Sequence, residues 1–174
     1  MLDKIKAQFN EAILEAFEAK DMPVVVCQRD STFALLKFLR YDSDFDFNLL
    51  TDLTAVDYLK YPQKQPKRYA VVYHLYSLEK KHRLRVKVSL GSDSLTIESV
   101  IPLWKTANWL EREVYDMYGI HFENHPNLKR ILNHIEFVGH PLRKDYPIQR
   151  RQILTINDSL VDEMEKCLKE KGLK

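Results

Sequence analysis

The sequence is poor in glycine and cysteine, and both shortages exclude classes of function. Four glycines in 174 residues form neither a Gly-x-x-x-x-Gly-Lys phosphate loop nor a Gly-x-Gly-x-x-Gly dinucleotide fingerprint. The two cysteines, Cys27 and Cys167, are too few and too far apart for an iron–sulfur cluster or a disulfide framework. We therefore expect the chain itself to bind no NADH, flavin or cluster, and to reside in a reducing compartment.

The sequence also lacks a long apolar run and a strong charge bias. No run approaches the ~20 residues that span a bilayer. Asp3, Glu11 and Glu15 argue against a transit peptide, and no signal-peptide core precedes them. A net charge of +2 is too small to indicate a nucleic-acid partner. We expect no membrane span, no nucleic acid, and a protein that stays where it is made.

Helical periodicity predicts four amphipathic helices. They cover residues 2–17, a stretch from Asp30 to at least Leu39, residues 102–118, and residues 158–170. In the second helix, Phe33, Leu36 and Leu39 should face inward. Gly119 should end the third helix in the left-handed conformation. In the fourth helix, which Gly172 follows, the inward residues should be Leu160, Met164, Cys167 and Leu168.

Strand signals predict a sheet. They cover residues 24–27, 45–50, 68–78, 83–90 and 95–101. Residues 68–78 are apolar on both faces, which indicates a central strand. Residues 83–90 alternate between apolar and polar, typical of an antiparallel strand with one solvated face. The last three strands should form a meander. The predicted fold class is α+β, an antiparallel or mixed sheet with helices packed on one face and an extended, loop-rich C-terminal segment.

The length of the chain predicts a single domain. Residues 1–119 should form its α+β core. Residues 120–174 should form an extended partner-docking segment with a terminal helix, packed on the same domain. We expect residues 120–152 to be irregular except for a helical turn at Asn127–Leu132. Irregular segments of this length usually have a function or a partner.

Histidines suggest a metal site at first. The candidates are His121, His125, His134 and His140. Two of them precede a proline, which favours an extended or turn backbone, and no cysteine or His-Glu-x-x-His helix joins them. Turn histidines with local hydrogen bonds are therefore favoured over a metal site.

Three carboxylates and an arginine crowd the third predicted helix. Glu111, Arg112, Glu113 and Asp116 lie within six positions, and Arg112 is one turn from Asp116, so these two could pair. A solvated helix face is the simplest interpretation. Catalysis is disfavoured, because no nucleophile with a partnered base accompanies the charges.

The end of this region is basic and stiffened by proline. It contains four cations, Arg143, Lys144, Arg150 and Arg151, and one acidic residue, Asp145. Pro141 and Pro147 hold its backbone extended. Such a segment is suited to lie along another protein, because arginine pairs bidentately with carboxylates in interfaces. A solvated tail is the alternative. RNA binding is disfavoured, because no base-stacking motif is visible.

Residues 108–147 resemble the signature of the C subunit of respiratory complex I, the NADH:quinone oxidoreductase, whose members form the 30 kDa subunit family. That signature is Glu-Arg-Glu, Asp-x-(aromatic)-Gly, His-Pro-x-Leu-(Lys/Arg)-Arg-Ile-Leu and Gly-His-Pro-Leu-Arg-Lys-Asp. The four pieces occur here in order, at residues 111–113, 116–119, 125–132 and 139–145. Residues 49–59 are similar to a further family segment.

The resemblance implies a non-catalytic structural subunit of the peripheral arm of the complex, which docks on the neighbouring D subunit near the quinone module and supports assembly. The partner-binding residues that it implies are Glu111, Arg112, Glu113, Asp116, His125, Pro126, Arg130, His140, Pro141, Arg143, Lys144 and Asp145. Cluster-bearing subunits would be further neighbours. Quinone, NADH, FMN and iron–sulfur clusters would belong to the parent complex, and none to this chain.

The implied location is peripheral, on the cytoplasmic face of the bacterial inner membrane or its organelle equivalent. An equivalent subunit of a related membrane-bound hydrogenase or ferredoxin-driven complex is the alternative. A stand-alone hydrolase, metal enzyme or RNA-binding module is a hypothesis of a different class. An enzyme would show a pocket with converging titratable groups.

Overall fold

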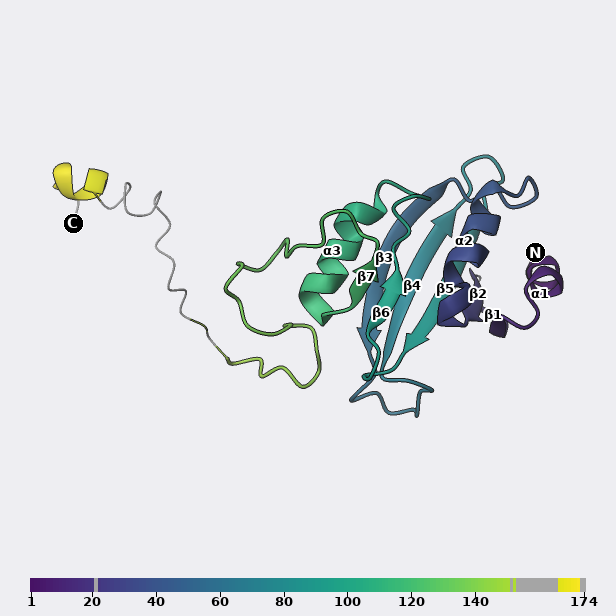
Figure 1. Cartoon of the computed structure of the whole chain (residues 1–174), viewed down its shortest axis with the longest axis horizontal. Coiled ribbons are helices and arrows are strands. Elements are labelled where there is room, and N and C mark those ends of the chain that lie inside the picture. The colour runs from purple at the N-terminus through teal and green to yellow at the C-terminus, as the bar shows by residue number, and fades with distance from the viewer. Residues whose placement is uncertain (21, 151, 153–165, 173–174) are drawn as a thin grey trace.

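The computed structural model describes residues 1–20, 22–150, 152 and 166–172. Figure 1 shows the elements. In chain order they are α1 (Leu2–Gln8), β1 (Ile13–Ala19), β2 (Met22–Cys27), η1 (Arg29–Ser31), α2 (Thr32–Tyr41), β3 (Leu49–Asp57), β4 (Tyr69–Tyr76), β5 (Arg83–Leu90), β6 (Thr96–Glu98), α3 (Ala107–Tyr118) and β7 (His121–Glu123).

Five strands form one mixed sheet in the order β1-β2-β5-β4-β3. β2 and β5 are parallel, and the other neighbours are antiparallel. The pairs Tyr73–Val86 and Val71–Val88 keep β4 and β5 in register. The predicted fold class, α+β with a mixed sheet, is confirmed.

Helices α2 and α3 lie on the same face of this sheet, in front of it in Figure 1. Leu36 and Leu39 of α2 and Val114 of α3 belong to one cluster of buried side chains with Tyr73 and Val86 of the sheet. Leu36 and Leu39 therefore face inward as predicted. Phe33 is only partly buried, and the fully buried Leu35 takes its expected place.

β5 shows the alternation that its sequence predicts. Leu84, Val86 and Val88 are buried on the helix-covered face, whereas Arg85 and Lys87 lie on the opposite face and are only half-buried. β5 is the middle strand, antiparallel to β4 but parallel to β2. β4 is interior and mostly buried on both faces.

The predicted N-terminal helix is wrong beyond its first two turns. α1 ends at Gln8, and Ile13–Ala19 is instead the edge strand β1, which pairs with β2 and is followed by Lys20 at a φ of +49°. Apolar residues at helical spacing predict a helix with one buried face. The same spacing is also compatible with an edge strand whose side chains are only partly buried. Pairing with β2 overrides the local preference.

Several further elements differ from the prediction. β3 begins at Leu49, so residues 45–48 are not strand, and α3 begins at Ala107 rather than Pro102. Within 95–101 only the short β6 is strand; it lies outside the main sheet and pairs with β7, so the predicted meander is wrong. Residues 127–132 form no helical turn. The end of α3 is confirmed, with Gly119 at a φ of +75°.

Of the predicted last helix, only residues 166–172 can be compared. Residues 166–170 are helical and Gly172 has a φ of +66°. Cys167 and Leu168 were expected to face inward but are exposed. Leu160 and Met164 lie outside the described residues.

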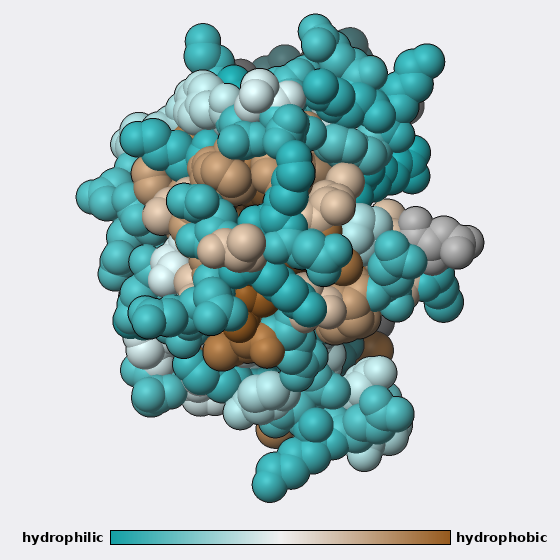
Figure 2. Space-filling view, turned by 90° about the vertical axis from the view of Figure 1, so that its right-hand side faces the viewer, coloured by the Kyte–Doolittle hydropathy of each residue, from teal (hydrophilic) through white to brown (hydrophobic). Residues whose placement is uncertain are grey.

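The molecular surface near the N-terminus is largely hydrophilic. Figure 2 views the molecule from the side of α1 and shows small hydrophobic areas among hydrophilic ones. Leu14 and Phe17 of the edge strand β1 are among the exposed apolar side chains. Among the helices of the described residues, none has the length and apolar character needed to cross a membrane.

One carboxyl group lies inside the core. Glu111 of α3 is fully buried and accepts hydrogen bonds of 2.7 Å from both the Ser99 hydroxyl and the Val100 amide. Burial raises the pKa of Glu111 to about 7, against the opposing effect of these two hydrogen bonds. The side chain thus ties α3 to the segment that follows β6.

We predict that Glu111→Gln changes how stability depends on pH. The raised pKa means that the contribution of Glu111 is fully present below about pH 4.5 and is lost as pH rises through about 7. Glutamine does not ionise; its side-chain oxygen can accept from the Val100 amide, and its NH2 group can donate to the Ser99 hydroxyl oxygen. As pH rises from 5 to 8, wild type should therefore lose about 2–3 kcal/mol of unfolding free energy relative to Glu111→Gln.

Urea unfolding followed by tryptophan fluorescence measures this shift, and Glu98→Gln at the exposed end of β6 is the matched control. If the unfolding free energies of wild type and Glu111→Gln depend on pH in the same way, Glu111 does not have a raised pKa in the folded protein.

Candidate functional site

Asp116 of α3 is the centre of the signature region. Its fully buried carboxylate accepts hydrogen bonds from the Arg130 guanidinium and from the consecutive amides of Ile131, Leu132 and Asn133, the last three at 3.1, 2.8 and 2.8 Å. The Asn133 side chain adds a fifth at 2.9 Å. Burial alone would raise the pKa of Asp116, but these donors outweigh it and lower the pKa to about 2. The carboxylate therefore stays charged and fixes residues 130–133.

The same stretch of chain also caps α3. We call residues 124–150 the C-terminal loop. The last carbonyl groups of a helix have no partner within it. Here three donors of the C-terminal loop satisfy them: His140 Nδ1 on Asp116 O (2.9 Å), the amide of Leu142 on Met117 O (3.1 Å) and Arg143 Nε on Tyr118 O (2.6 Å).

Two glycines are needed for this close packing. At Gly119, which has a φ of +75°, a Cβ atom would lie 2.4 Å from Arg143 Nη2 and 2.5 Å from His140 Nε2. At Gly139, which has a φ of +101°, a Cβ atom would lie 2.8 Å from the Tyr146 ring. Both the backbone conformation and the available space exclude larger residues.

A second anchor holds the C-terminal loop at the end of β3. The buried Asp57 carboxylate forms a bidentate pair with Arg68, with distances of 3.0 and 2.9 Å, and accepts the Lys144 amide at 2.9 Å. Arg68 Nη2 also lies 2.9 Å from the Asp145 carboxylate. Burial would raise the pKa of Asp57, but the hydrogen bonds from Arg68 and Lys144 outweigh it and lower the pKa. This anchor joins segments far apart in the sequence.

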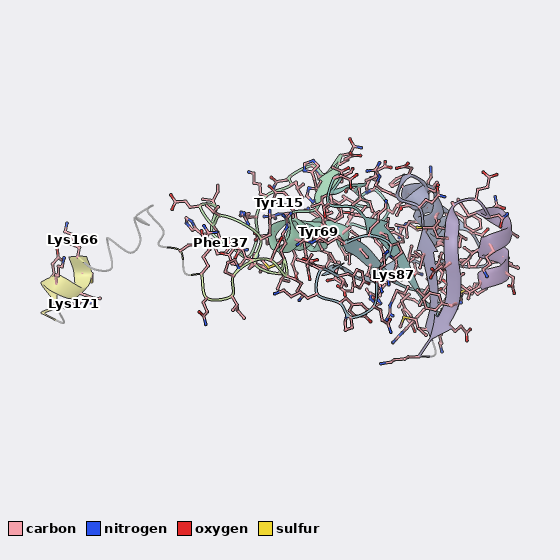
Figure 3. All side chains as sticks on the ribbon, turned by 90° about the horizontal axis from the view of Figure 1, so that it is seen from below. Tyr69, Lys87, Tyr115, Phe137, Lys166 and Lys171 are labelled. Carbon is pink, nitrogen blue, oxygen red and sulfur yellow. The ribbon has the colours of Figure 1, made fainter. Side chains whose placement is uncertain are left out.

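Aromatic contacts fasten the C-terminal loop between these anchors. The His140 and Tyr115 ring centroids are 6.4 Å apart, and those of Phe137 and Tyr146 are 5.8 Å apart. The Arg143 guanidinium lies 5.8 Å from the centre of the Tyr69 ring. Figure 3 labels Tyr69, Tyr115 and Phe137, which follow one another from the sheet to the C-terminal loop.

Arg112 does not pair with Asp116, as its spacing suggested. Its guanidinium donates to the carbonyls of Lys129 and Arg130, at 3.1 and 3.2 Å, and lies 5.5 Å from the Trp109 ring centre. The pairing prediction is wrong because Arg130, distant in sequence, occupies the carboxylate.

Two of the candidate histidines, His125 and His134, make the local hydrogen bonds that were predicted. His125 accepts the Asn127 amide at 3.0 Å and contacts Asn108 O at 3.2 Å, while His134 accepts the Glu136 amide at 3.3 Å. Within residues 1–20, 22–150, 152 and 166–172, no three His, Cys, Asp or Glu side chains form a group that could hold a metal ion.

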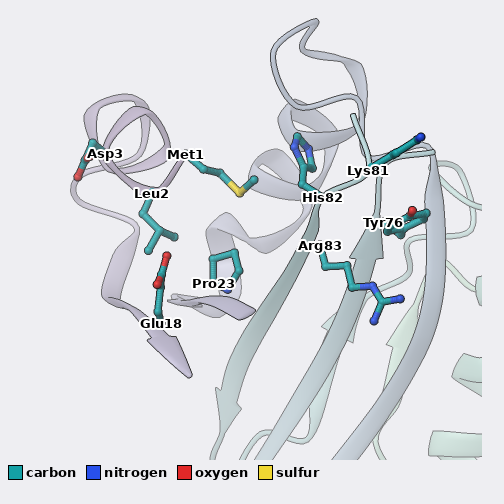
Figure 4. A pocket seen from close by; sticks show the side chains of 9 residues that line it. All are labelled: Met1, Leu2, Asp3, Glu18, Pro23, Tyr76, Lys81, His82 and Arg83. Atoms are coloured by element: carbon teal, nitrogen blue, oxygen red, sulfur yellow. The ribbon is translucent and has the colours of Figure 1, made fainter. Parts of the chain in front are cut away.

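A large cleft lies at the opposite end of the molecule, beside α1. It has a volume of about 750 Å³ and places Lys81, His82 and Arg83 across from Asp3 and Glu18, as Figure 4 shows. The His82 ring is already within 2.8 Å of the Phe45 carbonyl. The cleft has no nucleophile paired with a base among the residues that line it, so its geometry does not indicate an active site.

Apolar side chains project outward from the C-terminal loop and the start of α3. The exposed fractions are 65% for Trp109, 65% for Leu132, 79% for Ile135 and 63% for Val138. Sequence reasoning concentrated on charged and histidine residues and missed these four, which we call the apolar patch. The signal that could have found them is the number of aliphatic residues in a stretch without helix or strand periodicity.

The predicted site residues therefore divide into two groups. Seven of the twelve use their polar groups within the chain: Glu111, Arg112, Asp116, His125, Arg130, His140 and Arg143. Pro141, whose side chain is apolar, is partly buried. The side chains that are mostly exposed are those of Glu113, Pro126, Lys144 and Asp145. The structure brings most of the signature together around the end of α3, and it places Glu111 apart, in the core.

Comparison with known proteins matches most of the chain. The family model described as the 30 kDa subunit of respiratory-chain NADH dehydrogenase matches residues 25–152. The C subunit of NADH-quinone oxidoreductase from Geotalea uraniireducens (strain Rf4) is 48% identical over 146 residues, which cover 84% of this chain and 85% of that protein. The protein of the same name from Legionella pneumophila (strain Corby) is 37% identical, with coverages of 85% and 77%.

Two solved structures are also similar. A trypsin-resistant fragment (1–134) of Nqo5 is 34% identical with a TM-score of 0.63, and the match covers 73% of this chain and 96% of that one. A chain of the membrane-bound sulfane sulfur reductase, an archaeal respiratory membrane complex, is 22% identical with a TM-score of 0.69, at coverages of 95% and 89%. The second likeness shows the fold alone.

We predict that Asp116→Asn removes an acid-sensitive part of the stability. Because the pKa of Asp116 is lowered to about 2, its contribution is present above about pH 4 and is lost as pH falls through 2. The shift corresponds to about 2 kcal/mol, and the uncompensated Arg130 adds to the cost.

Urea unfolding between pH 2 and 7 should show a smaller acid-dependent loss for Asp116→Asn than for wild type, with Glu113→Gln as the exposed control on the same helix. The account fails if the variant and wild type lose stability equally across this range.

Proposed function

The chain belongs to the family of the 30 kDa subunit of respiratory-chain NADH dehydrogenase, and from this premise we propose that it is a non-catalytic scaffold that docks on the D subunit through its C-terminal loop. The chain is a subunit of a complex I-type complex, and its partners are other subunits of that complex. Its role in this proposal is to support assembly of the quinone module.

The observation that supports docking is the division of the C-terminal loop into a polar inside and an apolar outside. Its polar groups hold Asp116, Asp57 and the end of α3, whereas the apolar patch faces solvent. Large apolar side chains that gather on a surface often mark a protein–protein interaction site. A loop held by these contacts, with outward aliphatic side chains and with the exposed Trp109 of α3, fits a protein interface.

The signature residues then act in two ways. Asp116, Arg130, His140 and Arg143 shape the C-terminal loop and affect docking indirectly. Among the exposed residues of the signature, Glu113, Pro126 and Lys144 are suited to touch the partner directly. Each of these roles is part of the proposal.

Redox chemistry is assigned to the rest of the complex. The relatives are named as C subunits of NADH-quinone oxidoreductase, and we infer that NADH, FMN, iron–sulfur clusters and quinone are bound by neighbouring subunits, including cluster-bearing ones. We place this chain peripherally, on the cytoplasmic face of the bacterial inner membrane or its organelle equivalent. An equivalent place in a membrane-bound hydrogenase or ferredoxin-driven complex is the alternative.

Affinity purification of the tagged chain from gently solubilised membranes of its source tests this proposal. Recovery of the D subunit together with cluster-bearing subunits, identified by mass, is the expected result. Recovery with hydrogenase subunits would establish the alternative, and recovery of the chain alone would contradict both.

We predict that the double variant Leu132→Asp/Ile135→Asp weakens incorporation by about tenfold or more, because two side chains worth about 1.5–3 kcal/mol each on burial become charged. Its isolated stability should stay within about 0.5 kcal/mol of wild type, because both side chains are exposed. The matched control is Leu78→Asp, in the turn between β4 and β5, where the side chain is 58% exposed. Equal recovery of the double variant and the control would show that the apolar patch is not the interface.

A further inference from the structure

Positive charge is concentrated at one end of the molecule. Residues 57–68 and 141–150 together contain seven Lys or Arg and two Asp, a net charge of +5, whereas the whole chain has a net charge of +2. The remaining residues therefore carry a net charge of −3. The loop between β3 and β4, which projects downward in Figure 1, has no acidic residue of its own.

The structure joins these two segments and neutralises little of their charge. Asp57 and Asp145 both pair with one arginine, Arg68. The five other cations that are exposed have no ion pair with any described residue; we call them the basic surface, and they are Lys60, Lys64, Lys67, Lys144 and Arg150. These five cations are therefore available to form ion pairs with carboxylates of a partner.

An apolar cleft lies within the basic surface. It has a volume of about 620 Å³, and its walls include Leu59, Leu142 and Ile148 together with Lys60 and Lys144. The Ile148 side chain is 97% exposed. Aliphatic walls between ammonium groups suit a ligand in which aliphatic and acidic side chains alternate.

Internal contacts hold the β3–β4 loop in shape. The Tyr58 amide donates to Arg68 O at 2.8 Å, and the Tyr61 amide donates to Tyr58 O at 2.9 Å. The Tyr58 and Tyr61 rings meet edge to face at 5.4 Å. Lys87 of β5, labelled in Figure 3, lies 5.6 Å from the Tyr58 ring centre and adds a further cation nearby. A loop ordered in advance loses less entropy when it binds.

We infer that the basic surface is a second docking site, for an acidic segment of a neighbouring protein that carries aliphatic side chains. The segment places an aliphatic side chain in the cleft beside Ile148 and its carboxylates on Lys60, Lys64, Lys67 and Lys144. A protein fits better than a bilayer, because the apolar residues line a cleft rather than a convex face. A protein also fits better than RNA, because RNA bases stack on free aromatic rings and the exposed Tyr61 ring already packs against Tyr58.

The inference rests on the proposed function, since the neighbour is another subunit of the complex, but it uses residues outside the apolar patch. Arg68, Asp57 and Asp145 serve as structural supports of the site. Long-range attraction by the basic surface would also speed encounter with the partner at low salt.

Carbodiimide treatment of the purified complex tests the inference directly, because the reagent joins lysine amines to carboxylates that touch them. The expected products link Lys60, Lys64 or Lys67 to Asp or Glu residues of another polypeptide. Cross-links from these lysines only within the chain, or none, would overturn the inference.

Charge reversal gives the second measurement. Lys60→Glu/Lys64→Glu/Lys67→Glu should lower recovery of the cross-linked partner about tenfold, and Lys6→Glu/Lys37→Glu/Lys105→Glu, with the same charge change at other exposed positions, should not. If the triple variant instead loses only binding of the full chain to phosphatidylglycerol vesicles or to RNA, the protein partner is excluded. If wild type recovers other subunits but the triple variant matches it, this inference alone fails. If wild type recovers none, the proposed function fails.

Discussion

The buried charge of Asp116 is the constraint on which the C-terminal half of the structure depends. Removing a carboxylate from water costs several kcal/mol unless donors replace the water completely. All five donors to Asp116 come from residues 130–133, so α3 tolerates the charge only when the C-terminal loop is in place. The loop has no strand ladder of its own among its described residues and depends equally on the charge. Gly119 lets His140 and Arg143 approach, and it completes this mutual dependence.

A loop that satisfies its polar groups internally is free to turn its apolar side chains outward. In the proposed function, this arrangement lets the subunit contribute to the complex by offering a shaped surface whose ordering cost is already met by folding. The two buried carboxyl groups of α3, Glu111 and Asp116, show that burial alone does not set the direction of a pKa shift. Glu111 has two hydrogen bonds and a raised pKa, whereas Asp116 has a guanidinium and four further hydrogen bonds, and its pKa is lowered.

Local patterns predicted the parts of the fold that local physics decides. Gly119 ended α3 because a left-handed residue is needed there, and the alternation in β5 followed from one covered face. β1 could not be predicted, because its apolar spacing fits a helix as well as an edge strand and only pairing with β2 decides between them. The partner of Asp116 was also out of reach: Arg112 lies one helical turn away, but Arg130 arrives through a loop whose path no periodicity describes. The charged signature was found from the sequence, while the exposed Leu132 and Ile135 required the coordinates.

The central claim is that the C-terminal loop is folded on Asp116 before any partner binds. Amide hydrogen exchange of the isolated chain, resolved by residue, tests it most directly. The account predicts that the amides of Ile131, Leu132 and Asn133 exchange at least about a hundredfold more slowly than in an unstructured peptide. Exchange of these three amides at the unprotected rate, with the sheet amides still protected, would contradict it.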